Sequence, residues 1–332
     1  MNNIRLNANE NPYNTLNKSA LIESIGSFEF NRYPDANYKA LRKAISNISK
    51  VSTNQIITTN GSDELIQLLI LAFSNPSDNI LALEPTFSEY RKISSYLQRE
   101  YIGLEPKENL SLNKDTLIKA IHEYNPKIIF LCTPNNPTGE LLDQSFIENI
   151  LENTNSIVAL DEAYIEFSSE NNLNLLDNFD NLVIMRTLSK AYGLASLRIG
   201  YGITNKALIE KLNNCRMPYN ISGISAYIAT NALNTIDVEK YKILLLNEKN
   251  KILKKFKSLG INYLESSSNF ILFKMKDINP LYNQLVTEGI YIRKFKEKIL
   301  SNYLRFSIGT KNENEKFLKI VEDVISNASN WN

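Results

Sequence analysis

The sequence is poor in the residue types that most often carry catalysis and metal binding. It has one histidine, His122, and two cysteines, Cys132 and Cys215, among 332 residues. One histidine cannot build a metal cluster or a Ser-His-Asp triad, and two distant cysteines do not suggest a disulfide framework. We expect His122 to be structural or exposed and Cys132 to be a buried strand residue. Acid–base chemistry must then come from lysine, carboxylates, tyrosine or a cofactor.

The sequence also lacks an excess of charge of either sign and a long apolar run. It has 37 basic and 36 acidic residues, a net charge of +1, which gives no electrostatic case for nucleic acid or an acidic membrane surface. No apolar stretch approaches about 20 residues, so we expect no membrane span. The start "MNNIRLNANENPYN" does not have the pattern of a signal peptide. We therefore expect a cytoplasmic protein.

Between about residues 55 and 205, short apolar runs alternate with longer helical patterns. The runs are continuous and rich in β-branched residues, which is typical of strands buried on both faces. Their alternation with helices predicts an α/β fold with a mostly parallel sheet flanked by helices. Ligands of such sheets bind at the carboxyl ends of the strands, so the residues that follow each run are the candidates for a site. The runs are "QIITTN", "NILALE", "KIIFLC", "SIVALDEAY", "NLVIMRT" and "RIGYGI".

The pattern changes near residue 235, where a long Lys/Leu-rich helix leads into short strands and two further helices. This part reads as a smaller α+β domain. We predict a large domain over residues 30–235. We predict that residues 1–29 and 236–332 form the small domain, with the first segment as an N-terminal arm.

Two segments after predicted strands could bind an anion or a planar ring. In "TTNGSDELI" a turn at Gly61 starts a helix, with Ser62 and Asp63 at its N-cap. The segment is either a plain capped helix or a phosphate site. In "EPTFSEY", Phe87 could stack on a planar ligand, although core packing is the more frequent use of such a ring.

Two further strand ends carry polar side chains. In "CTPNNPTG" the residue before Pro137 is Asn136, which is biased to an extended conformation. Its amide can face a ligand, and a simple surface turn is the alternative. In "IVALDEAYIEF", Asp161 directly follows apolar strand residues and Tyr164 comes soon after. A carboxylate there is costly unless it is paired or hydrogen-bonded, so the choice is a structural ion pair, a helix cap or a ligand site.

The stretch "RTLSKAYGLASLRIGY" places Lys190 at another strand end. A lysine that is desolvated or near another cation can lose its proton and form a Schiff base. Ser189 and Arg198 supply a hydroxyl and a guanidinium, a common pairing for a phosphate. An amine, an acid, a tyrosine, an asparagine, an aromatic ring and phosphate ligands together are what pyridoxal 5′-phosphate requires.

In these motifs the chain resembles the fold-type I pyridoxal-phosphate aminotransferases, and most closely the histidinol-phosphate aminotransferase family. The resemblance runs almost from end to end, and the order of its motifs makes coincidence implausible. The motifs are "LNANENPY", "NRYPD", "NGSDELI", "EPTFSEY", "PNNPTG", "DEAYIEF", "RTLSKAYGLASLRIGY", "NFILF" and "LRFSIGT".

The resemblance implies a role for each of these residues at the cofactor. Lys190 would carry the aldehyde as a Schiff base, and Asp161 would keep the pyridine nitrogen protonated. Asn136 and Tyr164 would hydrogen-bond the ring oxygen, and Phe87 would stack on the ring. The phosphate would be bound by Ser62, Asp63, Ser189 and Arg198, and by Tyr33 of the partner subunit, which implies a homodimer with shared sites.

The resemblance also implies how substrates bind. Arg305 matches an arginine that holds a substrate carboxylate, and Asn269 matches a neighbouring substrate position. Arg293 matches an arginine near the substrate's phosphate end, with a solvated strand-end arginine as the alternative. The implied activity is ping-pong transamination between glutamate and a small phosphorylated keto substrate.

Three alternatives stay open from the sequence. A threonine-phosphate decarboxylase shares the fold and the lysine, an aminotransferase for aromatic amino acids shares the chemistry, and a regulatory effector-binding domain can keep this fold. The chain starts almost directly at "IRLNANENPY", whereas family members usually carry a further N-terminal segment. We therefore expect an acceptor pocket that is more open or differently closed.

Overall fold

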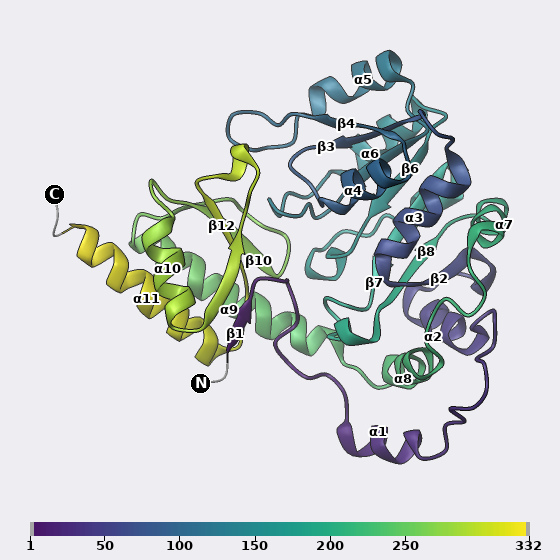
Figure 1. Ribbon diagram of the computed structural model, residues 1–332, viewed down its shortest axis with the longest axis horizontal. Coiled ribbons are helices and arrows are strands. Elements are labelled where there is room, and N and C mark those ends of the chain that lie inside the picture. The colour runs from purple at the N-terminus through teal and green to yellow at the C-terminus, as the bar shows by residue number, and fades with distance from the viewer. Residues whose placement is uncertain (1–2, 330–332) are drawn as a thin grey trace.

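The computed structural model describes residues 3–329, which form two sheets with helices around them (Figure 1). The larger sheet has the strand order β2-β8-β7-β6-β5-β3-β4. Only β8 runs antiparallel to its neighbours, and the other pairings are parallel. The mostly parallel sheet is therefore confirmed. Its strands are β2 (Ile56–Asn60), β3 (Asn79–Leu83), β4 (Glu100–Leu104), β5 (Ile128–Cys132), β6 (Ile157–Asp161), β7 (Leu182–Thr187) and β8 (Ile199–Ile203).

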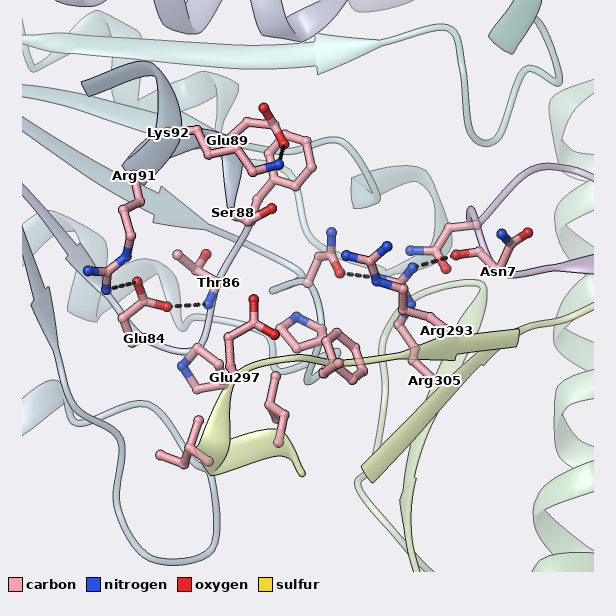
Figure 2. Close-up of a pocket in the computed structure, with 18 of the residues that line it drawn as sticks. Asn7, Glu84, Thr86, Ser88, Glu89, Arg91, Lys92, Arg293, Glu297 and Arg305 are labelled. Carbon is pink, nitrogen blue, oxygen red and sulfur yellow. Dashed lines mark hydrogen bonds and ion pairs between the residues drawn. The ribbon is translucent and has the colours of Figure 1, made fainter. Parts of the chain in front are cut away.

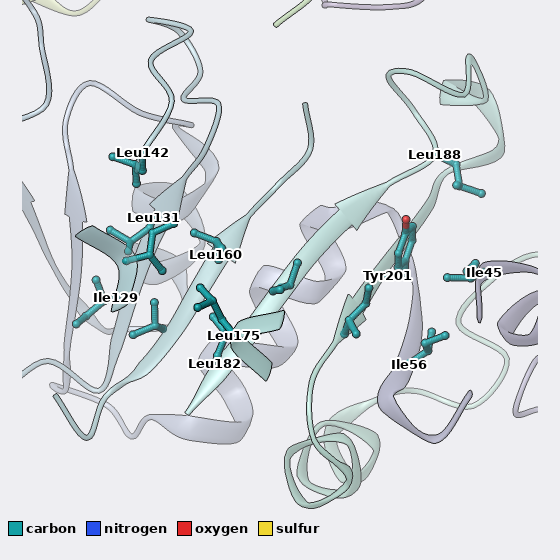
Figure 3. Packing of buried hydrophobic residues seen from close by; sticks show 14 of the residues in the cluster. Ile45, Ile56, Ile129, Leu131, Leu142, Leu160, Leu175, Leu182, Leu188 and Tyr201 are labelled. Atoms are coloured by element: carbon teal, nitrogen blue, oxygen red, sulfur yellow. The ribbon is translucent and has the colours of Figure 1, made fainter. Parts of the chain in front are cut away.

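Helices cover both faces of this sheet because the central strands have no polar face. Along β5, Ile129 and Leu131 belong to the core cluster that includes residues of α2, α5, α6 and α8, whereas Ile128 and Phe130 belong to the cluster that includes residues of α3, α4 and α7. Figure 3 shows part of the first of these two packed layers. The helices are α2 (Lys39–Ser49), α3 (Gly61–Phe73), α4 (Glu89–Tyr96), α5 (Leu117–Tyr124), α6 (Gln144–Glu152), α7 (Lys206–Cys215) and α8 (Gly223–Leu233).

The smaller sheet joins the start of the chain to its last third. Its strand order is β1-β11-β12-β10-β9, with β1 parallel to β11. The aromatic rings of Phe256, Phe273, Phe306 and Phe317 pack together in its core. Its elements are β1 (Ile4–Leu6), α9 (Val238–Ser258), β9 (Asn262–Tyr263), β10 (Phe270–Lys274), α10 (Asn279–Thr287), β11 (Ile290–Lys294), β12 (Tyr303–Ser307) and α11 (Lys311–Ser329).

The segment between the two sheets includes α1 (Lys18–Ile25) and leads to Phe28, whose ring contacts Tyr227 of α8 at 5.3 Å. The domain limits at residues 30 and 235 stay a prediction. Within residues 3–329, none of the helices has the length and apolar character needed to cross a bilayer. His122 is exposed on α5, and Cys132 is buried at the end of β5.

Candidate functional site

The predicted site residues gather at the carboxyl edge of the large sheet. A cavity of about 130 Å³ is bordered there by nine of them. A larger cavity of about 1100 Å³ adjoins it and shares the side chains of Phe87, Asn136, Tyr164 and Lys190. The nine residues are Ser62, Asp63, Phe87, Asn136, Asp161, Tyr164, Ser189, Lys190 and Arg198.

Lys190 follows β7 and lies half-buried in the wall that the two cavities share. Its Nζ donates to the carbonyl oxygen of Ala8 at 2.9 Å. Burial, with a smaller effect from the cations of Arg305 and Arg198, lowers the pKa of this amine to about 8, although Glu10 and Asp63 act in the opposite direction. A neutral, nucleophilic amine is therefore accessible within about one pH unit of neutrality.

Asp161 ends β6 and is buried at the bottom of the smaller cavity. Its Oδ1 accepts a hydrogen bond from the backbone N–H of Ala163 at 3.0 Å, and its Oδ2 accepts one from the Tyr90 hydroxyl at 2.5 Å. Burial raises the pKa of this carboxyl to about 6, and the two hydrogen bonds act in the opposite direction. The acid has no cationic partner among the residues described, so a cationic ligand group would suit it.

Tyr164 and Asn136 face the cavity from two neighbouring strand ends. The hydroxyl of Tyr164 accepts a hydrogen bond from Asn9 Nδ2 at 2.9 Å, and burial raises its pKa to about 12. Asn136 Oδ1 accepts from the guanidinium of Arg305. The preceding Asn135 is buried and donates to Pro85 O at 2.8 Å. One asparagine of the pair therefore holds the turn, and the other faces the site.

The start of α3 differs in detail from the sequence prediction. The N-cap is Asn60, and Ser62 and Asp63 lie in the first turn of the helix instead. The observed N-cap precedes the predicted one because the helix begins at Gly61, which has a φ of +77°. Asn60 makes no side-chain hydrogen bond to the described first turn. The backbone N–H groups of the first turn of α3 are therefore available to an anion.

Arg198 reaches this helix start from the beginning of β8. Its Nη2 lies 3.1 Å from Asp63 Oδ2, and both side chains are about half exposed. A Cβ on Gly61 would come within 2.7 Å of the guanidinium, and a Cβ on Gly200 would come within 2.4 Å of backbone. These glycines allow the start of α3 and the start of β8 to pack closely, and Ser62, Asp63 and Arg198 border the small cavity there. Ser189, whose Oγ accepts from Thr187 Oγ1 at 3.0 Å, also lines this cavity.

Two arginines face the larger cavity from adjacent strands of the small sheet (Figure 2). Arg293 on β11 is the direct cross-strand partner of Arg305 on β12. Arg305 is buried, and its Nη2 donates to Asn7 O at 2.9 Å. Its Nε has no hydrogen-bond partner within the described chain. Burial and the charge of Arg293 lower the pKa of Arg305, to about 10.

Two predicted residues lie outside both cavity linings. Asn269 is buried beside Arg305's strand and donates to Asn9 O at 3.1 Å, while its Oδ1 has no partner among residues 3–329. Tyr33 is 81% exposed, and its ring stacks on Tyr219 at 4.5 Å. Tyr33 does not line the small cavity of its own chain.

Sequence reasoning assigned no role to Asn9 and Tyr90, which contact Tyr164 and Asp161 directly. Both lie inside quoted motifs, "LNANENPY" and "EPTFSEY". Asn9 is 155 positions away from its partner, and Tyr90 is 71 positions away. Without the fold, no spacing pattern links residues that far apart. The sequence signal for Asn9 and Tyr90 was that each is a polar residue within one of the family's motifs.

Comparison with known proteins identifies the family. A family model described as aminotransferase class I and II matches residues 2–321. A histidinol-phosphate aminotransferase of Flavobacterium psychrophilum is 37% identical over 328 residues, which cover 97% of this chain and 90% of the relative.

Two solved structures share the fold. The histidinol-phosphate aminotransferase of Sinorhizobium meliloti, in complex with pyridoxal-5′-phosphate, has a TM-score of 0.90 at 20% identity and covers 98% of this chain and 91% of its own. The L-threonine-O-3-phosphate decarboxylase of Porphyromonas gingivalis has a TM-score of 0.79 at 22% identity, with 97% and 99% covered. At such identities the likeness concerns the fold alone.

The residues present fit the cofactor of this family. Asp161 is a buried acid that lacks a cationic partner in the described chain, as a protonated pyridine nitrogen requires. The N-terminus of α3 lies at the small cavity beside the guanidinium of Arg198, which suits a phosphate. The chain belongs to the aminotransferase class I and II family and is a pyridoxal-phosphate-dependent aminotransferase.

Proposed function

We propose that this aminotransferase moves an amino group between glutamate and a small phosphorylated amino alcohol or ketone of the histidinol-phosphate type, and so serves amino-acid biosynthesis. The relative that is 37% identical over nearly the whole chain carries that name. The observation that carries the proposal is the pair of arginines that face one another across β11 and β12.

Like charges placed opposite each other across two strands are unfavourable unless an anion lies between them or close by. Arg305 is buried, and no carboxylate among residues 3–329 is one of the charges that act on it. Its unpartnered Nε is free for a planar anion. A guanidinium fits a carboxylate through two parallel hydrogen bonds, so Arg305 suits the carboxylate of glutamate. Arg293, exposed at the same end of the cavity, suits a substrate phosphate.

We assign the cofactor contacts by the chemistry of each side chain. Pyridoxal phosphate, when bound, supplies an aldehyde and an electron-accepting pyridine ring. Asp161 would hold the proton of the pyridine nitrogen, and Asn136 and Tyr164 would donate to the ring oxygen. Phe87, which lines both cavities, would cover the ring face. Ser62, Asp63, Ser189 and Arg198 would surround the phosphate.

Lys190 is the proposed catalytic residue. Its amine, with a pKa of about 8, is basic enough to take the proton from the α-carbon of the amino donor and to hold it on Nζ. The same ammonium can return that proton later in the cycle. Because donor and acceptor would use one cavity in turn, ping-pong kinetics are expected.

We also propose a homodimer in which Tyr33 reaches the cofactor phosphate of the partner subunit. Tyr33 and Tyr219 are stacked and exposed, and Phe30 and Met217 nearby in sequence are about 70% exposed. Large exposed apolar side chains concentrated in two short segments are typical of an interface. A free monomer would leave Tyr33 without a function in its own site.

The test is a two-part assay with the purified holoenzyme. Borohydride treatment followed by peptide mass analysis should leave a pyridoxyl adduct on Lys190. The pyridoxamine form should then be mixed separately with phosphorylated and unphosphorylated keto compounds, with the cofactor's absorbance as readout. The proposal expects turnover with phosphorylated acceptors and regeneration by glutamate.

Arg293→Ala separates the two arginine roles. It should weaken the phosphorylated acceptor by about 10- to 100-fold in kcat/KM, because a charge-assisted contact is lost. The glutamate half-reaction should change little. Equal losses in both half-reactions would remove the phosphate role of Arg293. Release of carbon dioxide from a phosphorylated amino acid without any keto acceptor would replace the proposal with a decarboxylase.

A further inference from the structure

Tyr90 lies directly beneath the small cavity without lining it. It is in the first turn of α4, three residues after Phe87, and its side chain is fully buried. Its hydroxyl donates to Oδ2 of Asp161 at 2.5 Å. The other carboxylate oxygen accepts from the N–H of Ala163. The carboxylate of Asp161 is therefore held by two donors from two different segments.

The ring of Tyr90 has a fixed position as well. It stacks on Phe130 of β5, with ring centroids 4.5 Å apart and an interplanar angle of 4°. The same ring also contacts Phe87, edge to face, with centroids 5.7 Å apart. One side chain thus connects the acid at the bottom of the cavity with the aromatic ring in its wall.

We propose that Tyr90 is a positioning residue, which orients the carboxylate of Asp161 toward the cofactor's ring nitrogen, keeps it ionised, and supports the ring of Phe87. The inference rests on the proposed cofactor contacts of Asp161 and Phe87. It extends them to a residue that touches neither cofactor nor substrate.

The groups around Asp161 explain why such a donor is needed. Asp63 of α3 and the neighbouring Glu162 are both acids that disfavour its charged form, as burial does. The thiol of Cys132, opposite Asp161 on β5, stays protonated because burial raises its pKa far above the usual value. The Tyr90 hydrogen bond works against these effects. Burial and the charge of Asp161 raise the pKa of Tyr90 well above its ordinary value, so the phenol remains a donor at every working pH.

The matched variants are Tyr90→Phe and Tyr101→Phe, which each remove one hydroxyl and keep the ring. Tyr101 of β4 also donates to a carboxylate, Glu84 Oε1 at 2.8 Å, but it lines neither cavity. Two quantities are measured on the full chain. One is the affinity of the cofactor-free protein for pyridoxal phosphate, by equilibrium dialysis. The other is the pKa of the Asp161 carboxyl by infrared difference spectra, with Asp161→Asn subtracted to identify its band.

Tyr90→Phe should weaken cofactor binding about tenfold, because a hydrogen bond to a charged group is lost. It should raise the pKa of the Asp161 carboxyl by about one unit in the cofactor-free protein. Tyr101→Phe should change neither quantity. If both variants bind the cofactor equally well and share the wild-type carboxyl titration, the inference is wrong.

Replacement of Tyr90 by a fluorotyrosine, a stronger donor of nearly the same size, keeps the test decisive should Tyr90→Phe not fold. The pKa of the Asp161 carboxyl should then fall below the wild-type value, and an unchanged or higher value contradicts the inference. The infrared readout needs neither cofactor nor substrate. A failed glutamate half-reaction would therefore overturn the proposed function without affecting this result, and the reverse also holds.

Discussion

At the scale of single residues, the pKa of the Lys190 amine is set by its place in the fold. Burial is the main cause that lowers it to about 8, and the cations of Arg305 and Arg198 contribute to that value. The same side chain in an unfolded chain would have the ordinary value of 10.5. The nucleophile is thus activated by position, before any cofactor binds.

This predicts the pH dependence of Lys190 labelling in the cofactor-free protein. The rate of reaction with an amine-directed reagent should rise with pH and reach half its maximum near pH 8, because only the neutral amine reacts. Arg305→Met should move that midpoint to higher pH, because one repelling cation is removed. Peptide mass analysis at a series of pH values gives the midpoint. A midpoint near 10.5 in the wild type would contradict the burial argument.

The buried carboxyl of Asp161 lowers the stability of the cofactor-free fold at neutral pH. Its pKa is raised from 3.8 to about 6, so the folded chain binds a proton in a pH range where the unfolded chain has released it. The stability contributed by this group is therefore present below about pH 4 and is lost as the pH rises through 6. At neutral pH the cofactor-free protein has lost nearly all of the stability that the protonated carboxyl contributes at low pH.

Asp161→Asn should therefore stabilise the cofactor-free protein at neutral pH by up to about 3 kcal/mol. The gain should shrink at about pH 5, where the wild-type carboxyl is largely protonated. Urea unfolding at both pH values measures it. The control is Asp115→Asn, an exposed acid paired with Lys107, which should change stability much less, because solvent screens an exposed ion pair. A variant that is less stable than the wild type at neutral pH would show that the charge of Asp161 is well tolerated.

At the scale of elements, the site depends on how closely β8 approaches the start of α3. Gly200 makes this approach possible, since a Cβ there would come within 2.4 Å of the backbone of Gly61. On the same strand, the atoms nearest to a Cβ on Gly202 would be side-chain atoms of Ile57 and Leu65, at 3.1 Å. Backbone cannot yield to the extra methyl group, whereas side chains can.

Gly200→Ala should therefore lower the free energy of unfolding by about 1–3 kcal/mol and displace the N-terminus of α3. Cofactor affinity should fall with it, since the proposed phosphate contacts lie at that helix end. Gly202→Ala should cost less stability and leave cofactor affinity nearly unchanged. Chemical denaturation and cofactor titration of the two variants provide the comparison. Equal effects in both would argue against a phosphate site at the start of α3.

Another element, the segment over residues 7–15, connects the two sheets through the site. Carbonyl oxygens of Asn7, Ala8 and Asn9 accept hydrogen bonds from Arg305, Lys190 and Asn269. The side chain of Asn9 donates to Tyr164. This explains why an N-terminal motif can belong to a site that is otherwise built from strand ends.

At the scale of the whole molecule, the proposed shared sites predict complementation between two impaired variants. Lys190→Ala lacks the catalytic amine but keeps Tyr33, whereas Tyr33→Phe keeps Lys190 but weakens the cofactor phosphate contact of its partner. A hybrid dimer of the two has one site with both native residues. Mixing and refolding the two variants should restore activity well above the sum of the separate proteins, as steady-state assays would measure.

Sedimentation of the same mixture provides the control for this experiment. If the chain sediments as a monomer at assay concentration, or if mixing restores nothing, the shared site is wrong. Phe30→Asp, which places a charge in the exposed apolar segment near Tyr33, should shift the protein toward monomer and lower cofactor affinity.

The amino-acid sequence by itself determined the mostly parallel sheet and its active edge. Continuous apolar runs such as β5 and β6 can only be buried on both faces, and the polar residues that follow them, Asn136 and Asp161, must then lie at one edge. Lys190 could be located by the same argument. These are local patterns, each contained in about ten residues.

Only the tertiary structure decided which side chains meet across the site. The hydrogen bond from Asn9 to Tyr164, the one from Tyr90 to Asp161 and the alignment of Arg293 with Arg305 all join segments whose separation along the chain carries no information. They depend on strand register and on the packing of α4 and β1 against the sheets. The N-cap of α3 was misplaced for a related reason, because the left-handed Gly61, packed against Arg198, fixed where the helix begins.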